Sequence, residues 1–348
     1  MKSSFEIAGQ LVQSGCRQSI QLELPHLYTH TSASMPIHVV HGRREGPVLL
    51  ICAAIHGDEI NGVEIIRRLL SEKALTGLAG TLIAVPIVNV YGFMSRSRYL
   101  PDRRDLNRSF PGSESGSMAS RLADRFMTAV FSHCSHAIDL HTGAINRENL
   151  PQIRARVEGD EVTRAMALAF GVPVVLNSEL RDGSLRESAN NLNVPVLLYE
   201  AGEALRFDEV SIRAGVKGIL GVMAHLGMIR KRRGKPDYQP VISTDSYWVR
   251  AGQSGIFRAF ANSGDHVADG SVLGYINDPL GDNEIPVTSE RGGIVIGKSN
   301  LPLVYEGEAL FHVACYTGSE AVASQIEEFQ VEHDPQQNIN EQDEPPLV

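Results

Sequence analysis

Apolar and polar positions alternate in a regular way between residues 48 and 229. Short runs rich in β-branched residues are followed by longer segments whose apolar residues recur at helical spacing. The expected strands cover residues 48–55, 81–88, 137–141, 173–176 and 195–200, and the expected helices cover residues 62–70, 118–131, 160–170, 184–192 and 207–226. This alternation predicts an α/β fold with a mixed, largely parallel sheet flanked by helices.

The pattern changes near residue 228, where a short basic run, IRKRRGKPDYQP, follows the last helix. A basic stretch with Gly and Pro after a helix is typical of a solvated linker, and a nucleic-acid-binding patch is the alternative. From residue 246 to 314, short apolar runs separated by Gly, Asn and Asp predict a small, barrel-like all-β module. We expect an α/β domain over residues 1–230, whose N-terminal strands could be shared with the β domain, an all-β domain over 240–316 and a tail over 319–348.

Nearly all of the net charge of −9 comes from the C-terminal tail. Residues 319–348 contain eight acidic residues and no Lys or Arg, which leaves residues 1–318 at only −1. The tail is rich in Gln, Asn and Pro and poor in aromatic residues, so it buries too little apolar surface to offset the entropy lost on ordering. We expect it to be partly disordered beyond about residue 330.

No targeting or membrane segment is evident in the sequence. No run approaches the ~20 apolar residues of a membrane-spanning helix, and the N-terminus, MKSSFEIAGQ, lacks the apolar core of a signal peptide. The four cysteines, Cys16, Cys52, Cys134 and Cys315, lack C-x-x-C spacing, which indicates reduced thiols. These features predict a cytoplasmic protein with neither a nucleic acid nor a membrane as partner.

Potential metal ligands follow two of the expected strands. His56 and Glu59 come directly after residues 48–55, and His141 ends the run 137–141. If the two runs are neighbouring parallel strands, their ends bring together two imidazoles and one carboxylate, the ligands of a catalytic zinc site with one open position. Asp139 could orient the imidazole of His141, or it could be a buried acid paired elsewhere. H-x-x-E spacing alone recurs by chance, so the prediction depends on the second strand.

A loop rich in arginine lies between the two ligand motifs. Residues 95–112 contain five arginines and the packet DLNR, which ends in Asn107 and Arg108. The rigid guanidinium fork matches a carboxylate bidentately, so this pair suits a substrate acid group. A solvated basic loop is the alternative.

Glu200 ends the strand expected over residues 195–200. A carboxylate at such a strand end, next to a metal site, can accept a proton from water. Taken without its surroundings, the same residue could equally cap a helix.

In chain order, the motifs HGDE, DLNRSFPG, DLHTG and YEAG resemble those of the succinylglutamate desuccinylase/aspartoacylase family, a branch of the zinc-carboxypeptidase-like hydrolases. The resemblance covers about residues 39–227, and the β module is similar to that family's C-terminal domain in general character. It implies a zinc-carboxypeptidase-like sheet followed by a small β domain.

The resemblance also implies the chemistry of the site. One Zn²⁺ per chain would be held by His56, Glu59 and His141, and Glu200 matches the acid that activates water. The implied reaction is hydrolysis of an amide by metal-activated water, with protonation of the leaving amine by the same acid.

Several arginines enter through the resemblance. Asn107 and Arg108 would hold the substrate carboxylate, and an arginine shortly upstream would polarise the scissile carbonyl. Arg98, followed by an aromatic residue, matches that arginine better than its competitors Arg103 and Arg104.

A further carboxylate-binding arginine is expected at Arg186, although its spacing departs from the aspartoacylase pattern. The substrate's identity therefore does not carry over from the family.

The sequence predicts a zinc-dependent amidohydrolase, or deacylase, acting on an N-acylated amino acid or a similar small molecule that carries a carboxylate. The alternatives are a metallocarboxypeptidase acting on short peptides and a non-catalytic, zinc-dependent small-molecule binding protein. Homo-oligomerisation is left open.

Overall fold

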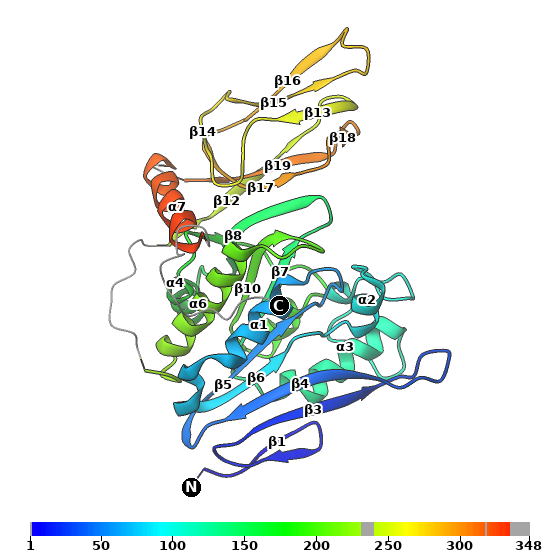
Figure 1. Ribbon diagram of the computed structural model, residues 1–348, viewed down its shortest axis with the longest axis vertical. Coiled ribbons are helices and arrows are strands. Elements are labelled where there is room, and N and C mark those ends of the chain that lie inside the picture. Colours follow the sequence, from blue (N-terminus) through cyan, green and yellow to red (C-terminus); the bar gives the residue numbers. More distant parts are fainter. Residues whose placement is uncertain (1, 231–239, 317–318, 335–348) are drawn as a thin grey trace.

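A large mixed sheet flanked by helices forms the body of the protein, and smaller antiparallel sheets accompany it (Figure 1). The structure is a computed structural model that describes residues 2–230, 240–316 and 319–334. Most of the basic run that follows residue 228 lies outside the described residues, as does the chain beyond residue 334. Among the described helices, none has both the length and the apolar composition needed to cross a membrane.

The elements follow one another closely along the chain. The helices are α1 (Asn61–Ser71), α2 (Val90–Ser95), α3 (Met118–Ala129), α4 (Glu161–Phe170), α5 (Leu185–Asn191), α6 (Glu209–His225) and α7 (Ser319–His333), with short 3-10 helices η1 (Lys73–Gly77), η2 (Leu106–Arg108) and η3 (Phe131–His133). The strands are β1 (Phe5–Ile7), β2 (Gln10–Val12), β3 (Arg17–Leu24), β4 (Ala33–His41), β5 (Arg44–Ala53), β6 (Ala79–Val85), β7 (His136–Gly143), β8 (Arg147–Ala155), β9 (Val174–Asn177), β10 (Val196–Glu203), β11 (Val241–Ser243), β12 (Asp245–Arg250), β13 (Gly255–Ala259), β14 (His266–Val267), β15 (Val272–Asn277), β16 (Glu284–Thr288), β17 (Gly293–Ser299), β18 (Leu303–Val304) and β19 (Ala309–Cys315).

The parallel centre of the sheet consists of β6, β5, β7 and β10, in that spatial order. Ile51 of β5 lies between Ala84 of β6 and Ile138 of β7. These four strands, together with β9 and the helices α1, α3, α4, α5 and α6, are the elements expected from the hydrophobic pattern, displaced by a few residues at most. The predicted α/β fold is therefore confirmed.

Helices cover both faces of the sheet because its central strands are apolar on both sides. Leu49 and Ile51 of β5 face a core shared with α1, α4 and α6. Leu50 and Cys52 face a second core, which includes residues of α3 and of the N-terminal strands. A strand buried on both faces reads as a continuous apolar run, and VLLICA is such a run.

Strand β8 was not among the strands expected from the sequence. Its residues RENLPQIRA mix charged, polar and apolar side chains, so no clear period marks them as a strand. Tertiary pairing forms the strand: β8 is antiparallel to β10 along one edge and to β17 along part of the other.

The C-terminal strands form the expected β module, and they also continue the main sheet. Strands β16, β15, β13 and β18 make a separate four-stranded sheet, while β12, β19 and β17 extend the large sheet through the pairing of β17 with β8. The boundary expected between an α/β domain and a β domain thus falls within one continuous sheet. A separately folding β domain stays a prediction.

The expectation that residues 319–348 form a tail with little packing is wrong for the part that the structure describes. Residues 319–333 form helix α7. Val322, Ile326 and Phe329 of this helix are almost fully buried, and they join cores built by the sheet and by α6. The three apolar anchors recur at i, i+4 and i+7, the spacing of one helix face. This local signal was outweighed by the acidic composition of the segment.

Phe329→Ala should lower the free energy of unfolding by about 3–5 kcal/mol, because a buried aromatic loses its transfer from water and leaves a cavity. Urea unfolding followed by circular dichroism measures the change. Val331→Ala is the matched control in the same helix, since that side chain is 49% exposed, and its effect should stay within about 0.5 kcal/mol. Small, equal effects in the two variants would contradict a stabilising role for α7.

Candidate active site

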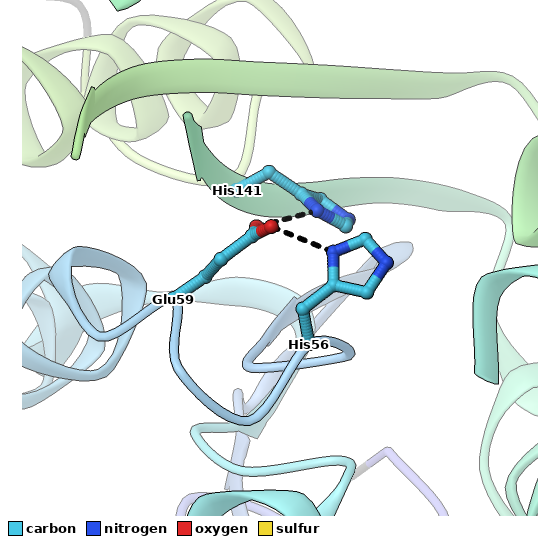
Figure 2. A group of neighbouring side chains, drawn as sticks. All are labelled: His56, Glu59 and His141. Carbon is cyan, nitrogen blue, oxygen red and sulfur yellow. Dashed lines mark hydrogen bonds and ion pairs between the residues drawn. The ribbon is translucent and has the colours of Figure 1, made fainter. Parts of the chain in front are cut away.

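The three potential metal ligands meet at the C-terminal edge of the parallel strands. His56 and Glu59 lie in the loop between β5 and α1, and His141 lies near the end of β7. Because β5 and β7 are parallel neighbours, the ends of both strands open on the same edge of the sheet. Figure 2 shows the Glu59 carboxylate between the two imidazoles, at 2.7 Å from Nδ1 of His56 and 2.8 Å from Nδ1 of His141.

The donor set fits a divalent metal ion. All three side chains are buried, and one ligand atom from each lies within 4.8 Å of the others. Two imidazole nitrogens and one carboxylate oxygen are the protein ligands of many catalytic zinc sites. The juxtaposition predicted from the strand ends is therefore present in the structure.

Each imidazole also contacts a second carboxylate through its other nitrogen. Nε2 of His141 lies 2.9 Å from Asp139, as expected, and Nε2 of His56 lies 3.1 Å from Asp105. Such carboxylates fix the orientation and the tautomer of a metal-binding imidazole. The contact of Asp105 was missed by the sequence analysis, which used the DLNR packet only for its last two residues.

Burial and charge act against each other in this cluster. Burial alone raises the pKa of Glu59, but His56 and His141 lower it overall, so the group stays ionised. Burial alone lowers the pKa of His141, but Asp139 and Glu59 raise it well above its ordinary value. The Glu59 carboxylate accepts a further hydrogen bond from the backbone N–H of Thr142, at 3.0 Å.

Glu200 lies beside this cluster, on the neighbouring parallel strand. It is the register partner of His141 across β10 and β7. Its Oε2 accepts a hydrogen bond of 2.8 Å from Nδ2 of Asn149, and its Oε1 lies 3.9 Å from Arg154. Both partners come from β8, the strand that was not expected, so neither could be assigned from the sequence.

The arginine loop brings one of its three competing arginines into the site. Arg98 donates to Asp105 at 3.0 Å and to Glu59 at 3.3 Å. Arg103 and Arg104 are exposed and do not line the pocket that contains the ligands. Arg98 is therefore the one placed next to the potential metal ligands.

The residues expected to bind a carboxylate lie around the same pocket. Oδ1 of Asn107 accepts the backbone N–H of Leu185 at 3.0 Å, which fastens the arginine loop to the start of α5, while Arg108 is exposed and lines the pocket. Arg186 donates to the carbonyl of Glu179 at 3.1 Å and to the hydroxyl of Ser178 at 3.1 Å.

Arg186 remains charged at neutral pH although it is largely buried. Burial, together with the nearby Arg154, lowers the pKa of Arg186 to about 10. Among the described residues, no carboxylate forms an ion pair with it or with Arg108. An anionic group in the pocket would supply the missing counter-charge.

The pocket has a volume of about 410 Å³ and is strongly cationic. It is lined by His56, Glu59, Arg98, Asn107, Arg108, His141, Thr142, Gly143, Ala144, Arg147, Asn149, Arg154, Ser178, Glu179, Arg181, Ser184, Arg186, Leu198, Glu200 and Trp248. Trp248 comes from β12 in the C-terminal module, and the Arg147 guanidinium lies 5.0 Å from the centre of its ring. These two residues were not expected from the sequence, because only the fold brings β8 and β12 to the ligand loops.

The comparison with known families agrees with the motifs. The succinylglutamate desuccinylase/aspartoacylase catalytic domain matches residues 45–226, more than half of the chain. The protein belongs to the succinylglutamate desuccinylase/aspartoacylase family, as its sequence motifs predicted.

Individual relatives cover most of the chain. It is 28% identical over 293 residues to N-alpha-acetyl-L-2,4-diaminobutyric acid deacetylase of Halomonas elongata, an alignment covering 80% of this chain and 85% of the relative. The product-bound ectoine utilization protein EutE (DoeB) of Ruegeria pomeroyi is similar with a TM-score of 0.78 and 26% identity, over 86% of this chain and 95% of that one. A succinylglutamate desuccinylase/aspartoacylase from Rhodobacter sphaeroides gives a TM-score of 0.77 and 25% identity, over 86% and 96%.

Asp105→Asn should weaken metal binding by about 10- to 100-fold, the usual cost of losing a carboxylate behind a metal-binding imidazole. The variant has one side-chain oxygen left, which cannot serve both His56 and Arg98. Competition with a fluorescent zinc chelator measures the affinity. Asp182→Asn, an exposed carboxylate in the loop before α5, is the control and should bind as the wild type does. Unchanged affinity in Asp105→Asn would contradict the orienting role.

Proposed function

We propose that the protein is a zinc-dependent amidohydrolase that removes the acyl group from an N-acylated amino acid or a similar small substrate bearing a carboxylate. The observation that carries this proposal is the arrangement of the two histidines around the Glu59 carboxylate, beside Glu200 and in a cationic pocket. Membership of a family that includes deacylases supports it.

His56, Glu59 and His141 would hold one zinc ion per chain, through Nδ1 of each histidine and a carboxylate oxygen. When bound there, zinc would supply Lewis acidity to the amide carbonyl and lower the pKa of water. Cobalt, manganese and iron suit the same ligand atoms, so metal analysis has to decide the physiological ion.

Glu200 accepts a proton from the attacking water and returns it to the leaving amine nitrogen. Its carboxylate lies on the strand next to His141 and is held from the side by Asn149, so it lines the pocket without being one of the proposed ligands. General acid–base catalysis of this kind requires a carboxylate within hydrogen-bond reach of the reacting water.

Arg98 stabilises the negative charge that develops on the carbonyl oxygen during attack. Its guanidinium is held next to the ligands by Asp105 and Glu59, and 28% of the side chain is exposed, which leaves donors accessible from the pocket. This placement favours Arg98 over Arg103 and Arg104 for the role.

The cationic wall binds the carboxylate of the substrate. Arg108 and Arg186 carry charges without a carboxylate partner among the described residues. Arg108 is exposed, but Arg186 is largely buried, and a buried guanidinium without a counter-ion costs free energy. Asn107 contributes indirectly, since its side-chain oxygen fastens Arg108's loop to α5.

The pocket favours a small substrate over a peptide chain. Trp248 places part of the C-terminal module at its wall, against Arg147 of β8, and the volume of about 410 Å³ suits an amino acid with a short acyl group. The carboxypeptidase alternative is therefore disfavoured, and the presence of a base disfavours a purely binding protein. We propose a small molecule as partner, without nucleic acid or membrane, and a cytoplasmic location.

Removal of the metal should abolish hydrolysis in a panel of N-acetyl, N-succinyl and N-formyl amino acids that includes N-alpha-acetyl-L-2,4-diaminobutyric acid, the compound in the name of the curated relative. We expect ~1 metal ion per chain. His141→Ala should lose both the ion and the activity because one ligand is missing. Metal content after dialysis and chromatographic detection of the deacylated amino acid are the measurements. The control, His225→Ala at an exposed histidine of α6, should retain both the ion and the activity. Full metal content in His141→Ala would contradict the assignment of His141 as a metal ligand.

Glu200→Gln should lower kcat by at least ~10²-fold, the usual contribution of a general base, while metal content stays at the wild-type level. Glutamine keeps the shape of the side chain but cannot accept the proton. Steady-state kinetics on the best substrate of the panel gives the comparison. Wild-type kcat in this variant would show that another group is the base.

Arg108→Lys should reduce kcat/KM for the free-acid substrate by at least about tenfold, because lysine keeps the charge but cannot form the bidentate pair. The methyl ester of the same substrate serves as the control and should lose much less. Equal hydrolysis of acid and ester by the wild type, with equal losses in the variant, would mean that Arg108 does not bind the substrate carboxylate and is only a solvated side chain of the loop.

A further inference from the structure

Backbone pairing links β10, the strand of Glu200, to the C-terminal module through β8. Asn149 of β8 is the partner of Gly202 in β10 on one side and of Gly297 in β17 on the other. Strand β17 belongs to the module, so the module's backbone lies directly beside Asn149.

Asn149 makes the shortest side-chain contact of the Glu200 carboxylate in the part of the chain that the structure describes. Its Nδ2 donates to Oε2 at 2.8 Å, whereas Arg154 is 3.9 Å from Oε1. The strand ladders shift register just beyond Glu200, toward both β7 and β8. Because regular strand pairing is interrupted there, the backbone holds the Glu200 carboxylate less firmly. The position of the carboxylate therefore depends more on its hydrogen bond with Asn149.

Gly297 provides the space in which the Asn149 amide lies. A Cβ atom at this glycine would be only 2.8 Å from Oδ1 of Asn149, while its next neighbours, the carbonyl of Glu148 and Cβ of His312, would be 3.1 and 3.8 Å away. The backbone of Gly297 lies outside the left-handed region, so its conformation does not demand glycine. The close approach of Asn149 Oδ1, together with the tight contact to the backbone carbonyl of Glu148, accounts for the missing side chain.

The two strands are held in this register by a buried hydrogen bond. Gln152 of β8 is fully buried, and its Nε2 donates to the carbonyl of Ile296 at 2.9 Å. Ile296 immediately precedes Gly297, so this contact fixes the strand segment on which Asn149 depends. Asn149 is itself only 7% exposed, which restricts its side chain to few rotamers.

We propose that Asn149 is a positioning residue for Glu200 and that the C-terminal β module sets its position through Gly297. This inference rests on the proposed role of Glu200 as the base. The module then has two roles at the pocket: it supplies a wall through Trp248, and it holds the base in the geometry for proton transfer.

Two variants disturb this contact from opposite sides. Asn149→Leu removes the N–H donor at similar volume and adds no charge beside Glu200, and Gly297→Ala displaces the Asn149 amide. In the zinc-loaded enzyme, each should lower kcat on the order of 10- to 100-fold, the scale of loss caused by a misplacement of about 1 Å, with KM and zinc content nearly unchanged. A crystal structure of Gly297→Ala should show the Asn149 amide displaced from Glu200.

A control at another glycine and a double variant test whether Gly297→Ala acts on Glu200 through Asn149 or by disturbing the C-terminal module in general. Gly292→Ala lies just before β17, where a Cβ atom would meet its nearest neighbour at 3.4 Å, an ordinary contact, and it should retain wild-type kcat. In an Asn149→Ala background, Gly297→Ala should change kcat by less than about threefold, because its effect is transmitted through the side chain that is now absent.

The outcomes distinguish this inference from the proposed function. If Glu200→Gln retains kcat, the assignment of the base fails and the inference fails with it. If Glu200→Gln loses turnover but Asn149→Leu and Gly297→Ala do not, only the positioning role is overturned. Equal losses from Gly297→Ala in the wild-type and Asn149→Ala backgrounds would also overturn it, because the glycine would then act by another route.

Discussion

The Glu59 carboxylate, buried between two imidazoles, is the constraint on which the site depends. An ionised carboxylate that is 2% exposed carries a large desolvation cost unless it is paired and hydrogen-bonded. His56, His141, Arg98 and the backbone N–H of Thr142 provide those partners. Each imidazole is in turn held by a second carboxylate, Asp105 for His56 and Asp139 for His141. The two imidazoles and the Glu59 carboxylate are therefore held in place as potential ligands of a divalent cation.

This cluster requires several chain segments to meet at one edge of the sheet. The parallel strands β5, β7 and β10 deliver the ligand loop, His141 and Glu200 because parallel strands all end on the same side. The arginine loop then covers the edge, tied to the ligands through Asp105 and to α5 through Asn107. The site is therefore a consequence of strand order as much as of residue type.

The antiparallel half of the sheet completes the pocket. Strand β8 carries Arg147, Asn149 and Arg154, and β12 carries Trp248. None of these residues belongs to the ligand motifs, yet they give the pocket its charge, its wall and the hydrogen bond to Glu200. The pairing of β8 with β17 makes the C-terminal module a structural part of the site.

The sequence by itself determined the α/β core, the potential metal ligands at the strand ends and the family, because these depend on local patterns. The apolar run VLLICA, residues 48–53, predicts a strand buried on both faces. The polar residues His56 and Glu59 follow this run, so they are expected at the end of the strand. Tertiary structure alone decided the contact of Asp105 with His56, the placement of Arg98 against Glu59, the strand β8 with Asn149, and the docking of α7 through Phe329. These features arise from contacts between residues far apart in the chain, and no local period or spacing encodes such contacts.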